Sequence, residues 1–489
     1  MYMSDITRLS VTELSKLLQS KALSAKETAQ AYLSRMEKAE HHIGAYLTVT
    51  GEEAIKTAED IDRRRMAGES LPPLAGVPMG IKDNICTKGI KTTCASRILH
   101  NFVPAYDATA YRKLADEGCV LLGKMNMDEF AMGSSTENSS VKVTRNPRDL
   151  SRVPGGSSGG AAAAVAANEA PFTLGSDTGG SIRQPASFCG VVGMKPTYGS
   201  VSRFGLIAFA SSLDQIGPLT RTVSDSALVL NALCGHDPKD STSVSRDYPD
   251  YTSELKKGVK GLRIAMPREF FGEGLHESVK SAVEKAADWY ASQGAEIVDV
   301  SLPTLKYALP AYYVISSAEA SSNLARFDGV RYGFRAEEYE DLNDLYIKTR
   351  SQGFGPEVKR RIMLGTFALS AGYFDAYYKQ ALKVRTRIME EFSNIFASCQ
   401  AVLSPVAPTT AYRIGEKTQN PLEMYLGDIY TVPVSIAGLP ALSVPCGADD
   451  KGLPVGMQLT GRPFSEPLLY RIAGAYEQEN RHVFGEVNL

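Results

Sequence analysis

The sequence predicts an α/β protein, and the clearest sign of this fold class is one strand–helix–strand unit in residues 262–300. Residues 262–266 are a short apolar run that ends at Pro267, and residues 297–300 are a second such run. Between the two runs, apolar side chains recur at the spacing of one helical face: Val279, Val283, Ala286, Ala287 and Tyr290. Gly294 follows as a residue that can end this helix. Because such a crossover joins parallel strands, we expect a sheet with helices on both faces.

Two further helices are predicted near the N-terminus, because two serines each begin a capping box. Ser10 is followed three residues later by Glu13, and Ser24 is followed by Glu27. In this motif the serine accepts a hydrogen bond from a free backbone N–H, and the glutamate reaches back to the amide of the serine. After the second box one helical face is apolar: Ala25, Ala29, Tyr32, Leu33 and Met36. We expect these helices to pack on the main body of the protein or on a partner.

Residues 154–217 are dense in glycine and serine, yet we predict a packed region rather than a linker. Apolar segments such as AAAAVAA, PFTL, VVGM and LIAFA interrupt the glycines regularly. Functional loops carried on a rigid sheet have this character. Further strands are predicted at residues 401–403, 442–444 and 456–459. The 489-residue chain is long enough for one large α/β domain or for two closely packed ones.

The composition indicates a globular protein without a nucleic-acid-binding surface of its own. Lysine plus arginine is 53 and aspartate plus glutamate is 55, so the net charge is −2, whereas nucleic-acid-binding proteins usually carry a basic excess. The seven cysteines form no C-x-x-C pair, which disfavours a zinc or thiol redox site. The N-terminus has no apolar signal region, and no run of about 18 apolar residues occurs. A cytoplasmic protein with no membrane contact is therefore expected.

A glycine-rich segment, PGGSSGGAAAAVAA, begins at Pro154 and opens onto an alanine-rich helix, where free N–H groups suit an anion. A phosphate loop is disfavoured, because Ala161 and Ala162 stand where the Walker motif requires lysine and then serine or threonine. Alternatively, the small residues let the backbone approach a reacting centre, with Ser157 or Ser158 held in the turn. On its own, such a segment is more often an ordinary loop.

A second segment, GSDTGGSIRQPA, places Ser181 directly after Thr178, Gly179 and Gly180. Unhindered backbone amides before a serine can form an oxyanion hole for a tetrahedral intermediate. The same residues fit a tight strand-to-helix turn that needs glycine at positive φ. The segment alone leaves these two interpretations even.

A serine nucleophile needs a base: histidine is the usual choice and can come from a distant segment, and lysine is the other option. None of the six histidines lies near either serine segment in the chain, and the G-x-S-x-G motif is absent. Lys82 ends the apolar run VPMGI, so burial could lower its pKa and leave its amine neutral. A surface lysine at a strand end is the simpler interpretation of this residue taken by itself.

Taken together, these segments resemble the amidase signature family. The pattern G-V-P-x-x-x-K-D-N of that family matches residues 76–84, and its glycine–serine signature matches residues 155–160 and 177–183. The resemblance implies a central mixed β-sheet between layers of α-helices. It also implies the catalytic roles: Lys82 as base, Ser157 as bridging serine, Ser181 as nucleophile, and Thr178, Gly179 and Gly180 as sources of oxyanion-hole amides.

Segments outside the signature resemble the branch of this family that supplies ammonia from glutamine to tRNA-dependent amidotransferases. These segments are residues 202–206, 211–218, 328–333, 358–365 and 424–428. The resemblance implies a glutamine pocket in which Arg361 pairs with the α-carboxylate and Asp428 takes the α-ammonium. Tyr312 would lie beside them, although its neighbour Tyr313 could fill the same place.

The same resemblance implies a heterotrimer in which this chain is the glutaminase and the partners are the B and C subunits of the amidotransferase. A partner would activate Glu-tRNA(Gln) with ATP and magnesium and transfer the ammonia to it, and Asp-tRNA(Asn) is a further candidate substrate of the complex. The tRNA would be held mainly by the B subunit. This chain itself would need no cofactor and no metal.

Residues 1–489 are expected to form a single amidase domain. Within it, residues 1–65 would be an N-terminal helical layer, residues 66–230 the catalytic signature core, and residues 231–489 the part that carries the substrate pocket. Two other functions are compatible with the sequence, namely a stand-alone amidase acting on other carboxylic amides and a catalytically idle scaffold protein. The presence of all three catalytic side chains disfavours the scaffold.

Overall fold

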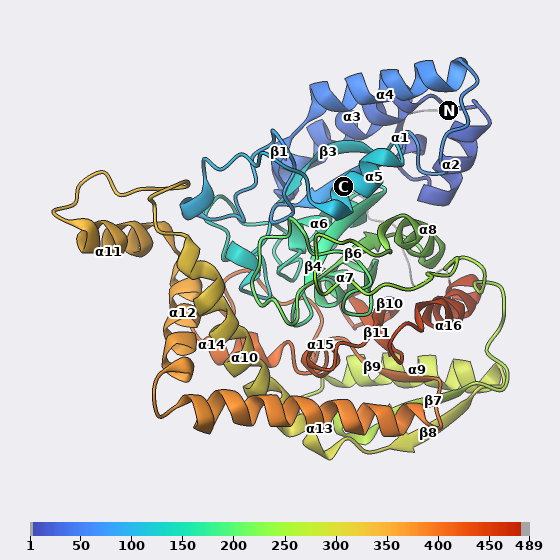
Figure 1. Cartoon of the computed structure of the whole chain (residues 1–489). Helices are drawn as coiled ribbons and strands as arrows, with labels where there is room; N and C mark the ends of the chain where they lie inside the picture. The colour runs from blue at the N-terminus through green and yellow to red at the C-terminus, as the bar shows by residue number, and fades with distance from the viewer. Residues whose placement is uncertain (1–2, 481–489) are drawn as a thin grey trace.

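The computed structural model describes residues 3–480, which form an 11-stranded mixed sheet flanked by helices (Figure 1). The strand order is β1-β3-β2-β4-β6-β5-β10-β11-β9-β7-β8. The strands are β1 (Tyr46–Val49), β2 (Pro78–Lys82), β3 (Val120–Met125), β4 (Phe172–Asp177), β5 (Val192–Lys195), β6 (Gln215–Thr220), β7 (Arg263–Pro267), β8 (Glu296–Val300), β9 (Ala401–Pro405), β10 (Ala441–Ala448) and β11 (Pro454–Thr460). The predicted fold class is confirmed.

Helices flank the sheet, and one of them projects from the molecule on one side (Figure 1). They are α1 (Met3–Ile6), α2 (Val11–Gln19), α3 (Ala25–Ile43), α4 (Gly51–Met66), α5 (Thr109–Asp116), α6 (Gly159–Ala166), α7 (Arg183–Cys189), α8 (Val223–Leu233), α9 (Glu277–Ser292), α10 (Ala308–Asn323), α11 (Leu342–Gly353), α12 (Pro356–Leu369), α13 (Lys379–Phe396), α14 (Pro421–Leu426), α15 (Val432–Ile436) and α16 (Glu466–Glu479). In Figure 1, α11 projects away from the body of the molecule. Within residues 3–480, no helix has the length and apolar character needed to cross a membrane.

The N-terminal region contains both predicted capping boxes and, in addition, an edge strand. Ser10 caps α2 and Ser24 caps α3, each with its glutamate bonded back to the cap amide. The segment predicted to be purely helical also contributes β1, which pairs antiparallel with β3. Sequence reasoning missed β1 because it is short and only its first residue is fully buried.

The strand–helix–strand unit predicted in residues 262–300 is present as β7, α9 and β8. The two strands are parallel neighbours, and the predicted apolar face of α9 is buried. Gly294 follows the helix with φ of +85°, a backbone conformation that glycine adopts at little cost. The three later predicted strands correspond to β9, β10 and β11.

Residues 154–217 lie in the centre of the fold, as predicted for a packed region. All eight residues of α6 are buried, and the helix packs on α7 and β4. A Cβ on Gly160 would lie 2.5 Å from the carbonyl oxygen of Asn126, so only glycine permits this approach. A second buried cluster joins α10, α12 and α13 to β7 and β9. The candidate site lies between this cluster and the central sheet.

Candidate active site

Adjacent parallel strands bring the two halves of the predicted catalytic signature together. β2 pairs parallel with β4, with Gly80 opposite Thr173 and Ile81 opposite Leu174. Lys82 is the last residue of β2, and the 178–181 loop begins where β4 ends. Because the carboxyl ends of parallel neighbours lie at one edge of a sheet, the lysine and the loop share that edge.

The Lys82 amine is buried and bonded to both serines of the first signature segment. Its Nζ lies 2.7 Å from Ser157 Oγ, 2.9 Å from Ser158 Oγ and 3.2 Å from the carbonyl oxygen of Ser176. The side chain is fully buried. Burial lowers the pKa of Lys82 to about 7, against the attraction of the carboxylates of Asp128 and Asp177. The surface-lysine interpretation is therefore wrong.

The hydroxyls of Ser157 and Ser158 have different hydrogen-bond roles toward Lys82. Ser158 Oγ also lies 3.1 Å from the Ser176 carbonyl oxygen, which can only accept, so Ser158 donates there and accepts from Lys82. A neutral Lys82 amine has two N–H donors and one lone pair. If the donors serve Ser158 and Ser176, the lone pair faces Ser157, which then donates its proton to nitrogen. The hydroxyl placed to give a proton to Lys82 is therefore that of Ser157.

Ser181 lies beside the two serines through a backbone contact. The amide of Ser158 donates to the carbonyl oxygen of Ser181 at 3.1 Å. Ser181 is buried except for 7% of its surface, whereas Ser157 has no exposed surface. Among the contacts of residues 3–480 there is no direct hydrogen bond between the hydroxyls of Ser157 and Ser181. In enzymes without substrate such catalytic contacts are often long and tighten in the complex.

The amides of the 178–181 loop are not equivalent. The Gly180 amide donates to Asp177 Oδ1 at 2.9 Å, so it already has an acceptor. The amides of Thr178, Gly179 and Ser181 have no acceptor within the part of the chain that the structure describes. The Thr178 hydroxyl is also used, because it donates to Asp214 Oδ1 at 2.7 Å.

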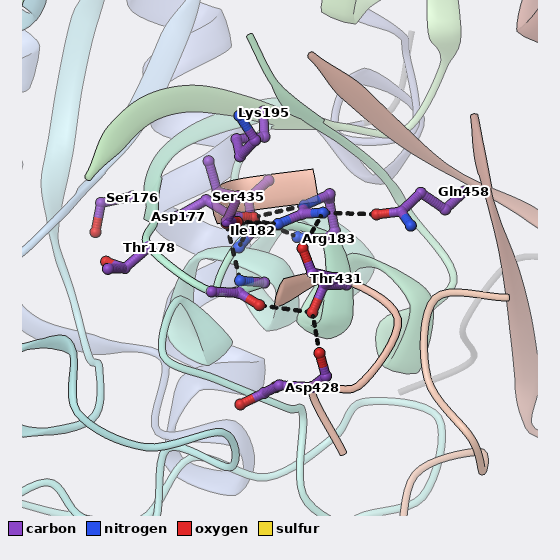
Figure 2. A network of polar contacts seen from close by, with 12 residues as sticks. Ser176, Asp177, Thr178, Ile182, Arg183, Lys195, Asp428, Thr431, Ser435 and Gln458 are labelled. Carbon is purple, nitrogen blue, oxygen red and sulfur yellow. Dashed lines mark hydrogen bonds and ion pairs between the residues drawn. The ribbon is translucent and has the colours of Figure 1, made fainter. Parts of the chain in front are cut away.

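A buried ion pair supports this loop from behind. Arg183 Nη2 lies 2.9 Å from Asp177 Oδ1, and neither side chain is exposed. Burial alone would raise the pKa of Asp177, but the Arg183 guanidinium holds it below its ordinary value. Figure 2 shows Arg183 between Asp177 and Gln458, whose side-chain oxygen accepts from Arg183 Nη1 at 2.6 Å. Removing one partner of such a pair would leave an uncompensated buried charge.

Two of the predicted pocket residues lie next to the 178–181 loop. The Tyr312 ring on α10 rests against Gly179, where a Cβ would come within 2.6 Å of the ring. Asp428 Oδ2 accepts from the Ser134 hydroxyl at 2.8 Å. Burial raises the pKa of Asp428 to about 7, against the opposing effects of Ser134 and Arg361. A buried carboxyl of this kind favours a cationic ligand, which would restore its charged form.

The third pocket residue, Arg361 on α12, is positioned by a carboxylate and two aromatic rings. Its Nε donates to Glu357 Oε1 at 2.6 Å, and Tyr425 donates to the same oxygen at 2.7 Å. The guanidinium carbon lies 4.6 Å from the ring centre of Tyr313 and 4.9 Å from that of Tyr425. Thus both tyrosines that the sequence could not separate are used, Tyr312 against the loop and Tyr313 beneath the arginine.

A surface cavity of about 830 Å³ borders this pocket. Glu357 belongs to its lining, together with Glu137 and Lys359. Through Glu357 the cavity reaches the region around Arg361. In residues 3–480, no group of three or more histidine, cysteine, aspartate or glutamate side chains is arranged to hold a metal ion.

Sequence reasoning missed the residues that hold the predicted ones in place. These are Ser134, Asp177, Arg183, Glu357 and Thr431. Asp177 and Arg183 lie inside the signature, and their opposite charges six residues apart beside a buried strand were an available signal. Nothing in the sequence indicated Ser134 or Thr431, because their contacts join segments that are far apart in the chain.

The fold and the site together define an α/β enzyme with lysine-and-serine chemistry, of the kind that cleaves amides. The family model described as Amidase matches residues 27–470, and the chain belongs to this family. It is 59% identical over 477 residues to the glutamyl-tRNA(Gln) amidotransferase A subunit of Thermoanaerobacter pseudethanolicus, a match that covers 98% of this chain and 97% of the relative. The protein of the same name from Moorella thermoacetica is 60% identical, with 98% of each chain covered.

A solved structure of similar sequence has the same architecture. The crystal structure of the glutamyl-tRNA(Gln) amidotransferase A subunit from Thermotoga maritima matches with a TM-score of 0.80 and 43% identity. The match covers 100% of this chain and 98% of that one. The similarity thus extends over the whole described fold and is not confined to the signature segments.

Proposed function

We propose that this chain is the glutaminase component of a tRNA-dependent amidotransferase. It hydrolyses glutamine to glutamate and ammonia, and a partner protein uses the ammonia to convert Glu-tRNA(Gln) to Gln-tRNA(Gln), or Asp-tRNA(Asn) to its amide. The complex is then a carbon–nitrogen ligase with glutamine as the amide donor. The observation that carries this proposal is the buried Lys82 amine, 2.7 Å from Ser157, beside a pocket with Arg361 and Asp428.

The first chemical step forms a tetrahedral intermediate on Ser181. Neutral Lys82 accepts the proton of Ser157, and Ser157 takes the proton of Ser181. Ser181 Oγ then attacks the side-chain amide carbon of glutamine, which gives a tetrahedral oxyanion. Backbone amides of the 178–181 loop stabilise this charge. Because the Gly180 amide is bonded to Asp177, we assign this role chiefly to Gly179 and Ser181, with Thr178 as a further donor.

The second step releases ammonia and restores the enzyme. The proton returns through Ser157 to the leaving nitrogen, the carbon–nitrogen bond breaks, and ammonia departs from a γ-glutamyl ester on Ser181. Water then attacks the ester carbon while the same lysine–serine pair takes its proton. The ester bond breaks, Ser181 regains its hydrogen, and glutamate leaves. The covalent intermediate divides one difficult step into two easier ones.

The charged pocket residues favour an amino acid over a simple amide. Arg361 keeps its terminal nitrogens for a carboxylate, because its contact with Glu357 uses Nε. Asp428 would take the α-ammonium, and Tyr312 lies against the loop at Gly179, two residues before Ser181. A stand-alone amidase acting on uncharged amides would not need a buried arginine and a buried aspartate beside the nucleophile.

The partners are proposed to be the B and C subunits in a cytoplasmic heterotrimer. The B subunit would hold the tRNA and use ATP and magnesium, while this chain supplies ammonia without a cofactor of its own. The net charge of −2 agrees with a chain that leaves tRNA binding to a partner.

The test is glutamate release from glutamine by the full chain, alone and with its partner proteins, with and without ATP and Glu-tRNA(Gln). We expect release that depends on Ser181 and increases with partners and tRNA. Hydrolysis of varied amides without preference for glutamine, and without any partner effect, would instead establish a stand-alone amidase.

A further inference from the structure

Thr431 lies between the backbone of Asp428 and the 178–181 loop. Its Oγ1 lies 2.6 Å from the carbonyl oxygen of Gly179 and 3.2 Å from the backbone carbonyl oxygen of Asp428. Figure 2 shows the contact between Thr431 and Asp428 as a dashed line. The side chain is fully buried. A hydroxyl has only one proton to donate, and the shorter contact takes it. Thr431 therefore donates to the loop.

This hydrogen bond fixes one peptide plane of the loop at both ends. The carbonyl of Gly179 and the N–H of Gly180 belong to the same rigid planar unit. The carbonyl accepts from Thr431, and the N–H donates to Asp177 Oδ1 at 2.9 Å. Together with the dihedral angles of Gly180, the orientation of this unit sets the direction of the next amide, which is that of Ser181.

The same contacts close a ring of hydrogen bonds. Arg183 Nη1 donates to the backbone carbonyl of Thr431 at 3.0 Å, and Arg183 Nη2 donates to Asp177 Oδ1 at 2.9 Å. Thr431 is thus bonded to the loop directly and also through the buried ion pair (Figure 2). Loss of the hydroxyl would open this ring at its contact with the Gly179 carbonyl.

Asp428 and Thr431 belong to one backbone turn. The amides of Thr431 and Val432 both donate to the carbonyl oxygen of Asp428, at 3.1 and 3.0 Å. This 428–431 turn leads directly into α15. A displacement of the Asp428 backbone on ligand binding would therefore move the Thr431 backbone as well.

Close packing leaves the turn and the loop little freedom to move apart. A Cβ placed on Gly180 would lie 2.3 Å from Thr431 Oγ1, so the hydroxyl rests on the loop backbone. Close-packed interiors transmit small displacements of this kind. The backbone turn that carries Asp428 is thus linked to the 178–181 loop by one continuous set of contacts.

We propose that Thr431 is a positioning residue that couples occupancy of the Asp428 carboxyl to alignment of the 178–181 loop. Glutamine, whose α-ammonium reaches Asp428, completes the alignment, whereas an amide without an α-ammonium does not. This inference rests on the proposed function, since it requires Asp428 to bind the α-ammonium of glutamine. It concerns the rate of attack by Ser181 rather than the affinity for substrate.

The experiment compares two substrates in three variants. Ammonia release is measured from glutamine and from glutaramic acid, the same amide without the α-amino group, using the full chain assembled with its partner proteins. Thr431→Val keeps the shape but removes the hydroxyl, Thr431→Ser keeps the hydroxyl, and Ser435→Ala is the matched control. Ser435 accepts from Arg183 Nη2 at 2.7 Å but, within residues 3–480, makes no hydrogen bond to the Gly179 carbonyl.

We expect Thr431→Val to lower kcat for glutamine about tenfold or more, the size of effect that small misplacements cause. KM for glutamine and the slow rate with glutaramic acid should each change by less than about threefold, because the loop is not aligned by that substrate even in the wild type. Thr431→Ser should restore kcat. Ser435→Ala should change the rates with glutamine and with glutaramic acid by the same factor.

Equal losses with both substrates in Thr431→Val would overturn the coupling, as would an unchanged kcat for glutamine. If glutaramic acid is hydrolysed too slowly to measure, Thr431→Val is made in an Asp428→Asn background and kcat for glutamine is compared. We expect no further loss of kcat, and a further loss of about tenfold would exclude the coupling. Thermal unfolding of each variant controls for misfolding. Absence of glutaminase activity in the wild type would instead count against the proposed function.

Discussion

The catalytic side chains and the pocket side chains are built into the molecule in different ways. Lys82 is the last residue of β2, and Ser181 lies in the loop that follows the parallel neighbour β4. Ser157 directly precedes Ser158, the N-cap of the buried helix α6. By contrast, the pocket uses Arg361 from α12 and Asp428 from a turn before α15. The catalytic half therefore depends on one sheet edge, whereas the pocket depends on how the second buried cluster packs against that edge.

The two halves also differ in what their charged groups do without substrate. Within residues 3–480, the hydrogen-bond partners of Lys82 are two serine hydroxyls and one backbone carbonyl, and burial shifts its pKa toward neutrality. Arg361 already has an acidic partner in Glu357. The catalytic half is thus poised for proton transfer, while the pocket is arranged for charge pairing. Changes in the first should act on kcat, whereas loss of the Arg361 charge should act chiefly on KM.

The largest effect is expected from the nucleophile. Ser181→Ala should lower kcat by about 10⁴-fold or more, because no other group can form the acyl-enzyme. The thermal unfolding temperature should stay near that of the wild type, since Ser181 contacts Ser158 through its backbone carbonyl rather than its hydroxyl. Glutamate release and the melting curve are measured on the same preparation. Substantial residual activity would contradict the assignment of Ser181.

The two serines that contact Lys82 provide an internal comparison within the catalytic half. Ser157→Ala should lower kcat about 10³-fold, because it removes the proton path between Ser181 and Lys82. Ser158→Ala should cost about tenfold or less, since Ser158 donates to the Ser176 carbonyl and only orients the lysine. Steady-state kinetics on glutamine measure both. A reversed order would mean that Ser158 is the bridging residue.

The pocket is expected to show the opposite kinetic signature. Arg361→Met keeps much of the apolar stem but removes the guanidinium, so KM for glutamine should rise about 10²-fold while kcat falls less. Glu357→Gln is the matched control, because it weakens the contact that positions Arg361 and leaves the positive charge of Arg361 in place. A loss confined to kcat in Arg361→Met would contradict the assignment of Arg361 to the substrate carboxylate.

The difference between the two halves also explains what could be predicted from the sequence. Capping boxes and the strand–helix–strand unit depend on local spacing, and the structure contains them as predicted. The apolar run before Lys82 made its burial possible but also fitted a surface lysine at a strand end, so this residue alone did not decide the matter. The contact of Thr431 with Gly179 joins residues 252 positions apart, and that of Ser134 with Asp428 joins residues 294 positions apart. Such contacts follow from packing between elements and leave no local pattern.

The oxyanion-loop prediction shows the same limit at the scale of a single amide. The glycines at 179 and 180 indicated unhindered donors, but the Gly180 amide is taken by Asp177. Residue types alone could not reveal this, because the direction of each N–H depends on the backbone dihedral angles. Gly180 has φ of +143°, a value that residues with a Cβ strongly disfavour.

The smallest expected effect, a gradual dependence on pH, separates the two halves without altering the wild-type site. Lys82 must be neutral to accept a proton, and its pKa is about 7, so activity should fall as the pH drops below 7. Asp428 must be charged to hold an α-ammonium, and its pKa is also about 7, so binding should weaken over the same range. In the complex with glutamine the ammonium keeps Asp428 charged, so kcat reports Lys82 alone.

The acid limbs of the two kinetic profiles should therefore differ in slope. We expect kcat to fall about tenfold per pH unit, and kcat/KM to fall more steeply because two groups titrate in the free enzyme. In Asp428→Asn only the lysine titrates, so the two profiles should become parallel. Profiles that are already parallel in the wild type would contradict the assignment of Asp428 to the ammonium.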